Sequence, residues 1–113
     1  MPAPFEELAN LDRLIHEPAR LAILTALAAC KSADFTYLLS LTGLTNGNLS
    51  QHLAKLENGG LVLIEKTFAR KMPRTVVRLS PDGRRSVDQH WRRLEQMRRS
   101  ALRWRAQARA EEG

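Results

Sequence analysis

The sequence has 113 residues and a single cysteine, Cys30. This length suits one compact domain and is too short for two. One cysteine cannot form an intrachain disulfide, so a reducing cytoplasm is the expected compartment. No apolar run approaches the roughly 18 residues of a membrane-spanning helix, and the start of the chain has no signal-peptide pattern. We therefore expect a cytoplasmic protein with no membrane partner.

The chain is basic, with a net charge of +6 and a pI near 10.4. Residues 1–34 carry three basic and five acidic side chains, whereas residues 35–79 carry six and two, and residues 80–113 carry nine and five. The positive charge therefore lies in the last two thirds of the chain. A solvated surface is the simplest explanation, and a polyanionic partner is the functional one.

Two helices are predicted at the start of the chain. Apolar side chains, Leu8 among them, recur at helical spacing over residues 5–15 and predict a first helix. Pro18 suits the first turn of a second helix over residues 18–30, which is apolar around much of its circumference. We expect this second helix to lie at the centre of the fold.

Two further helices follow a break at residues 31–34. The third is short, with Asp34 as its expected N-cap and Gly43 at its end. A tight corner leads to the fourth helix, over residues 45–58, whose expected N-cap is Thr45. This pair of helices around a corner predicts a helix-turn-helix.

The apolar period then changes from helical to alternating. Residues 61–67 predict a strand, residues 70–74 a polar turn, and residues 75–79 the returning strand of a hairpin. Ser80 is the expected N-cap of a last helix over residues 81–108. The order of elements predicts a mainly α fold with a small β-hairpin (α+β): a winged helix-turn-helix with a long C-terminal dimerisation helix.

The fourth helix has the composition of a helix that lies in a DNA major groove. Leu49, Leu53 and Leu56 share one face and should point inward. The opposite face has amides and small residues, and it has no carboxylate before Glu57. Amides can pair with base edges, although a solvated helix face is the alternative. The candidate contacts on this helix are Thr45, Asn46, Gly47, Asn48, Ser50, Gln51, His52 and Lys55.

The predicted hairpin is one-sidedly basic. No acidic residue falls between Lys66 and Arg78. A hairpin of this charge, the wing, can reach phosphates or the minor groove of a duplex. Its candidate DNA contacts are Lys66, Arg70, Lys71, Arg74 and Arg78.

The segments ADFTYL, TGLT, GNLSQHL and PRT form a specific combination that resembles the compact winged helix regulators of the MarR and ArsR type. The resemblance runs from Leu11 to Leu79. It implies a homodimeric, sequence-specific DNA binder, with residues 45–55 on bases and backbone and the 66–74 wing on DNA. The extra helices that form the MarR ligand cleft and the paired cysteines of metal-sensing ArsR proteins are missing. No small-molecule effector is therefore identified.

The long last helix is the candidate for dimerisation. A domain of this size cannot cover such a helix, so its apolar stripe needs a partner, unless the helix folds back on its own domain. The chain then divides into a 5–79 core, whose wing spans about 61–79, and an 81–108 dimerisation helix. The arginines of this last helix are either further candidate phosphate contacts or part of a solvated face. The candidate interface residues are Val87, Trp91, Leu94, Met97, Ala101, Leu102 and Trp104.

Catalytic, metal and cofactor sites are not predicted. The three histidines are far apart in sequence, no glycine-rich phosphate loop is present, and Cys30 lies in an apolar helix, where a redox role has little support. We therefore expect no enzyme. The sequence favours a homodimeric transcription regulator that binds double-stranded DNA. The alternative is a winged helix protein-interaction module for an acidic partner.

Overall fold

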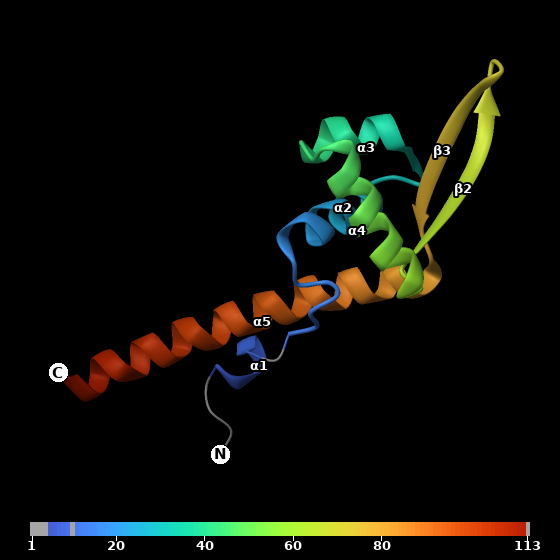
Figure 1. The fold of residues 1–113 in the computed structure, drawn as a ribbon. Coiled ribbons are helices and arrows are strands. Elements are labelled where there is room, and N and C mark those ends of the chain that lie inside the picture. Colours follow the sequence, from blue (N-terminus) through green and yellow to red (C-terminus); the bar gives the residue numbers. More distant parts are fainter. Residues whose placement is uncertain (1–4, 10, 113) are drawn as a thin grey trace.

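The computed structural model describes residues 5–9 and 11–112, without the side chains of residues 7, 8 and 112 (Figure 1). The predicted role of Leu8 therefore lies outside the described side chains. The three strands, β1 (Ala33–Asp34), β2 (Val62–Ala69) and β3 (Met72–Leu79), form one antiparallel sheet in the order β1-β3-β2. The fold is mixed α+β with a long C-terminal helix, which confirms the predicted class. The elements are α1 (Glu6–Ala9), α2 (Pro18–Ala28), β1 (Ala33–Asp34), α3 (Phe35–Thr42), α4 (Asn46–Asn58), β2 (Val62–Ala69), β3 (Met72–Leu79) and α5 (Pro81–Glu112).

The predicted first helix over residues 5–15 is wrong for residues 11–15, which are not helical. An Asp12 carboxylate oxygen accepts the N–H of Leu14 at 2.9 Å, which closes a local turn. The Arg20 guanidinium donates to the carbonyls of Leu14, at 2.7 Å, and Arg13, at 3.1 Å. These two carbonyls thus tie the segment before α2 to a side chain of α2. The apolar spacing still serves packing, because Ile15 is buried.

The sheet is larger than predicted. Residues 33–34, expected to be part of a break, form β1, in which Ala33 pairs with Val77 of β3. The hairpin turn is two residues long, Arg70 and Lys71, in place of the expected residues 70–74. Pro73 lies inside β3, opposite Phe68. Proline is tolerated there because β1 pairs only with Val76 and Val77, so β3 has a free edge at Pro73.

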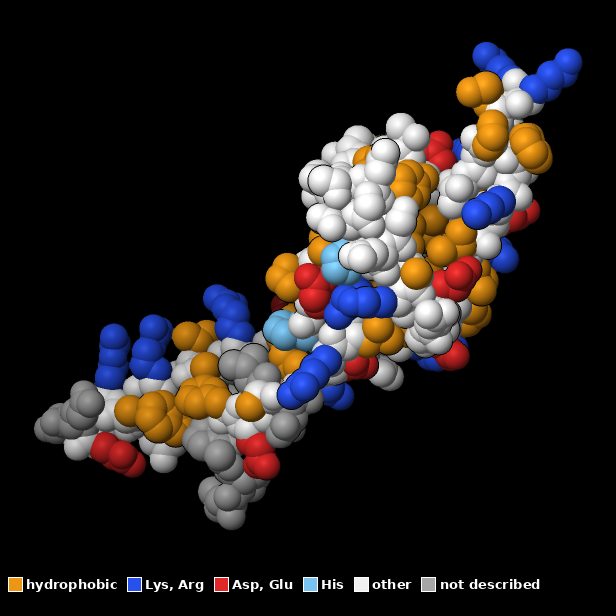
Figure 2. Space-filling model, viewed as in Figure 1, with side chains coloured by type: hydrophobic (Ala, Val, Ile, Leu, Met, Phe, Trp, Pro, Cys, Tyr) orange, Lys and Arg blue, Asp and Glu red, His pale blue; other side chains and the backbone are white. Residues whose placement is uncertain are grey.

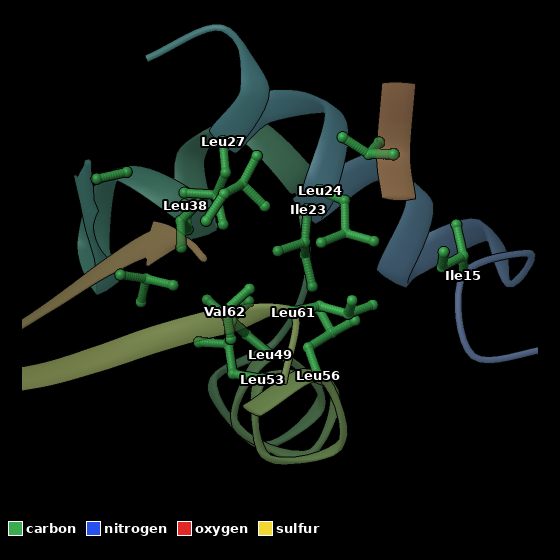
Figure 3. Packing of buried hydrophobic residues seen from close by; sticks show 14 residues of the cluster. Ile15, Ile23, Leu24, Leu27, Leu38, Leu49, Leu53, Leu56, Leu61 and Val62 are labelled. Atoms are coloured by element: carbon green, nitrogen blue, oxygen red, sulfur yellow. The ribbon is translucent and has the colours of Figure 1, made fainter. Parts of the chain in front are cut away.

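The hydrophobic core lies between α2, α3, α4 and the base of the sheet. Figure 3 shows Ile23 and Leu27 of α2 and Leu38 of α3 above Val62 of β2, and Leu49 of α4 below it. All five are almost fully buried. Burial of a side chain of this size stabilises a fold by roughly 1.5–3 kcal/mol. The core thereby fixes the angle between α3 and α4 and leaves the opposite face of α4 exposed.

The start of α5 is held against the beginning of the wing. The Ser80 hydroxyl donates to the carbonyl of Gly60 at 2.6 Å and accepts the N–H of Gly83 at 2.9 Å, which confirms Ser80 as the N-cap. A Cβ atom at Gly83 would overlap the carbonyl oxygen of Leu61. This close backbone approach sets where α5 leaves the domain.

Most of α5 extends away from the domain (Figure 1). The chain measures 70 × 23 × 22 Å, with a radius of gyration of 18.1 Å, whereas a compact chain of this length has about 13 Å. Within the described residues, His90 is the last buried residue of α5. Phe5 meets Trp104 edge to face, with 6.0 Å between ring centroids. No described helix is long and apolar enough to cross a bilayer.

Candidate nucleic-acid interface

The N-terminus of α4 is held by local interactions. Gly43 ends α3 at a φ of +70°, a left-handed conformation that favours glycine. Two residues later, Thr45 Oγ1 accepts the N–H of Asn48 at 3.1 Å, as predicted for the N-cap. Since Leu49 and Leu53 are buried, the first turns of α4 can project only the opposite side chains from the domain.

The exposed face of α4 is polar and nearly uncharged. Figure 2 shows an almost uncharged surface over α3 and the first half of α4. Lys55 supplies one cation, and Glu57 is the first carboxylate in this helix. Such a face can approach a polyanion without repulsion, and its amides can donate and accept hydrogen bonds at base edges. Its exposed members are Asn46, Gly47, Asn48, Ser50, Gln51, Ala54 and Lys55.

His52 lies apart from this face. Its Nδ1 atom is 3.3 Å from Arg20 Nη1 and 3.7 Å from Glu17 Oε2, so the imidazole is directed toward the start of α2. Burial tends to raise the pKa of Glu17, but hydrogen bonds from the Arg20 and Ala19 N–H groups and the charges of His52 and Arg20 lower its pKa overall. This cluster joins α4 to α2, and the sequence offered no signal for it. A DNA contact by His52 stays a prediction.

The wing carries its cations at an unusual turn. Arg70 and Lys71 have φ angles of 51° and 66°, so both occupy the left-handed region of a two-residue hairpin turn. Such turns favour Asn and Gly, because a Cβ is strained there. Two exposed basic side chains thus occupy positions where local stability favours other residues, and Figure 2 shows basic side chains projecting from the wing tip. Lys66 and Arg78 are also exposed along the strands.

Arg74 has a different environment from the cations at the tip. Its Nε is 3.5 Å from Asp34 Oδ2, and the side chain is 48% exposed. The other oxygen of Asp34 accepts the N–H of Tyr37 at 2.7 Å and caps α3, as predicted. Asp34 therefore joins the wing to the first helix of the helix-turn-helix.

The predicted dimer residues fall into two groups. Val87 is 2% exposed and belongs to the core of its own domain, so its assignment to an interface is wrong. Trp91 is 44% exposed, and its indole N–H donates to Thr25 Oγ1 of α2 at 3.0 Å. Beyond His90 no described residue is buried. The remaining candidates on this projecting helix are half-buried or exposed: Leu94, Met97, Ala101, Leu102 and Trp104.

The α5 stripe also follows the seven-residue repeat of packed helix pairs. Leu94, Ala101 and Ala108 are seven residues apart, and Met97 and Trp104 lie three residues after the first two. This a/d spacing is typical of helices that pack along their length against another helix. Within the described residues, α1 covers only a short part of this length.

These features define a helix-turn-helix followed by a basic wing, and comparisons with known proteins agree. Residues 19–97 match the winged helix DNA-binding domain family. The chain is 32% identical over 72 residues to an uncharacterized protein of Methanocaldococcus jannaschii, a match that covers 64% of this chain and 78% of the relative. The chain therefore belongs to the winged helix DNA-binding domain family.

Solved structures place the chain among regulators. A transcriptional regulator homologue from Pyrococcus horikoshii has a TM-score of 0.74 and 33% identity, over 80% of this chain and 91% of its own. A MarR-family regulator from Silicibacter pomeroyi has a TM-score of 0.61 and 27% identity, over 89% of this chain and 63% of its own. These relatives confirm the predicted MarR-like winged helix type, a class of regulators and not of enzymes.

Proposed function

We propose that the protein regulates transcription as a homodimer that binds double-stranded DNA sequence-specifically, with α4 in the major groove and the wing on phosphates or in the minor groove. One observation carries the proposal: a face of α4 without carboxylates stands beside a wing that is basic from Lys66 to Arg78. Both the N-terminus of α4 and the wing tip project from the side of the domain opposite α5 (Figure 1). A duplex can therefore meet both elements together.

The two elements have separate tasks in this proposal. Gln51 is exposed on α4 and can bond bidentately to an adenine edge, which supplies discrimination of about 1–3 kcal/mol. Arg74, Arg70 and the lysines of the wing contact the backbone, which supplies affinity for any sequence. The proposed DNA contacts are those predicted from the sequence, with His52 the least accessible among them.

The deciding experiment is an in vitro selection of duplex sequences by the full chain at low salt. We expect enrichment of a two-fold symmetric site whose half-sites lie about one duplex turn, roughly 34 Å, apart. Gln51→Ala should relax the preference at one position of each half-site, whereas Arg74→Ala should weaken binding to selected and random DNA alike. A selection without enrichment would favour the protein-interaction alternative.

We further propose that the stripe of α5 beyond His90 forms the dimer interface with a second copy. Its support is the repeat of half-exposed apolar residues on a helix that has left the domain. Met97→Glu places a charge in this stripe and should give a monomer in sedimentation velocity, with weaker binding to a symmetric site. The neighbouring change Gln96→Glu adds the same charge at an exposed position off the stripe. The assignment would be contradicted if both variants were monomeric, or if both remained dimeric.

A further inference from the structure

The tip of the wing is apolar as well as basic. Phe68 is 73% exposed and Met72 is 67% exposed, the highest values among the large hydrophobic side chains of the described residues. They flank the turn formed by Arg70 and Lys71. In Figure 2, orange side chains lie directly behind the blue ones at the tip. Neither residue belongs to the hydrophobic core, so stability of the domain does not require them.

The register of the hairpin places these residues on opposite faces. Phe68 pairs with Pro73, and Ala69 pairs with Met72. Since paired residues share a face and successive residues alternate, Phe68 and Pro73 form one apolar face, and Ala69 and Met72 form the other. A flat partner surface would cover only one of these faces. A slot with two walls covers both.

The surrounding charges indicate what lines that slot. Lys66 lies on the face of Phe68 and Arg74 on the face of Met72, each two residues from the apolar side chain, and the turn adds two more cations. The complementary surface is therefore a slot with apolar walls and anionic rims. The minor groove of DNA has this composition, because its walls are deoxyribose rings and its rims are phosphates.

We infer that Phe68 and Met72 pack against the deoxyribose walls of the minor groove beside the major groove that holds α4. This inference rests on the proposed function and specifies how the wing contacts DNA. The minor groove of B-DNA is about 6 Å wide, which is narrower than a two-stranded ribbon with side chains on both faces. The wing tip therefore has to widen the groove where it enters.

The test uses the full-length double variant Phe68→Ala/Met72→Ala on the selected site. Hydroxyl radicals attack deoxyribose hydrogens in the minor groove, so a footprint reports coverage of these sugars. The control is Leu63→Ala, which removes a 43% exposed apolar side chain at the base of the same strand, about 17 Å from Phe68. Thermal melting should show all variants folded, because the substituted side chains are exposed.

We expect the double variant to lose sugar protection outside each α4 half-site and to bind about tenfold more weakly per wing. The slope of log affinity against log salt should not change, because no charge is removed. Leu63→Ala should match the unaltered protein. Unchanged footprint and affinity would overturn the inference while leaving DNA binding intact, and a change in sedimentation would assign the tip to a second copy. Absence of any DNA binding by the unaltered chain would overturn the proposed function as well.

Discussion

Replacing the two residues of the wing turn by Asn-Gly should stabilise the protein and weaken its binding to DNA. Arg70 and Lys71 both have left-handed backbone angles, each of which costs an L residue roughly 1–2 kcal/mol. Asn and Gly adopt these angles with little strain. Part of the gain is lost because glycine has more freedom in the unfolded chain. We therefore expect Arg70→Asn/Lys71→Gly to raise the free energy of unfolding by about 1 kcal/mol and Tm by about 4 °C.

The same double variant removes two cations from each wing. Each lost phosphate contact lowers the slope of log affinity against log salt by about 0.9, so a dimer should lose about 3.6 from that slope. Thermal melting measures the first effect, and fluorescence anisotropy of labelled DNA over a salt series measures the second. The exchanged pair Arg70→Lys/Lys71→Arg keeps both charges and both backbone angles, and it serves as the control.

The two measurements separate the two parts of the reasoning. A variant with lower stability would show that the turn is not strained, whatever the DNA result. A more stable variant with an unchanged salt slope would show that the wing tip does not contact phosphates. Only the combination of higher stability and a lower slope supports a turn whose charges serve binding at a cost in stability.

Three further changes test other parts of the structure. Gly47→Ala meets no atom within 4 Å and should stabilise α4 by about 0.5–1 kcal/mol, yet weaken specific DNA binding at least tenfold if bases approach there. Gly83→Ala should destabilise by about 3 kcal/mol, because the new methyl overlaps the backbone of Leu61. Lowering the pH should destabilise the protein through His90. This residue is buried, and its Nε2 atom lies 3.2 Å from Nδ1 of His16. Burial first, and then the charges of His16 and Arg93, lower the pKa of His90.

The sign of the pH effect follows from proton uptake. With its pKa lowered in the folded state, His90 binds a proton more readily in the unfolded chain, whose histidines titrate near about pH 6.5. Its contribution to stability is therefore complete above that pH and is lost as the pH falls toward the lowered value. His90→Gln should flatten the melting temperature between about pH 7 and 5, and an unchanged profile would assign the pH dependence to another group.

Controls for the glycine changes come from the same helices. Ala54→Ser changes an exposed residue of α4, and it should neither stabilise the fold nor remove the open approach at Gly47. Arg84→Ala follows Gly83 directly and leaves the backbone contact intact, removing only an exposed side chain whose Nη1 donates to the carbonyl of Ala28 at 3.4 Å. Equal effects of Gly83→Ala and Arg84→Ala would show that the close approach to Leu61 is not the cause.

The sequence by itself determined the elements whose causes are local. The caps at Asp34, Thr45 and Ser80 and the leucine spacing of α4 depend on residues within one or two helical turns, and the structure has them as predicted. The basic wing was visible because no acidic residue falls between Lys66 and Arg78 in the sequence. These signals were sufficient to define the winged helix class and the face of α4 proposed to read DNA.

Tertiary structure decided the features that join distant parts of the chain. The bond between Arg20 and His52 spans 32 positions, and the Ser80 bond to Gly60 spans 20. The segment 11–15, predicted as helix, is also held by a distant side chain, because the Arg20 guanidinium bonds to the carbonyls of Arg13 and Leu14. Such contacts depend on which surfaces the core brings together, whereas spacing along the chain reports only on neighbours. The direction in which α5 leaves the domain and the two-faced apolar tip of the wing likewise emerge only once the Gly83 contact and the hairpin register are known.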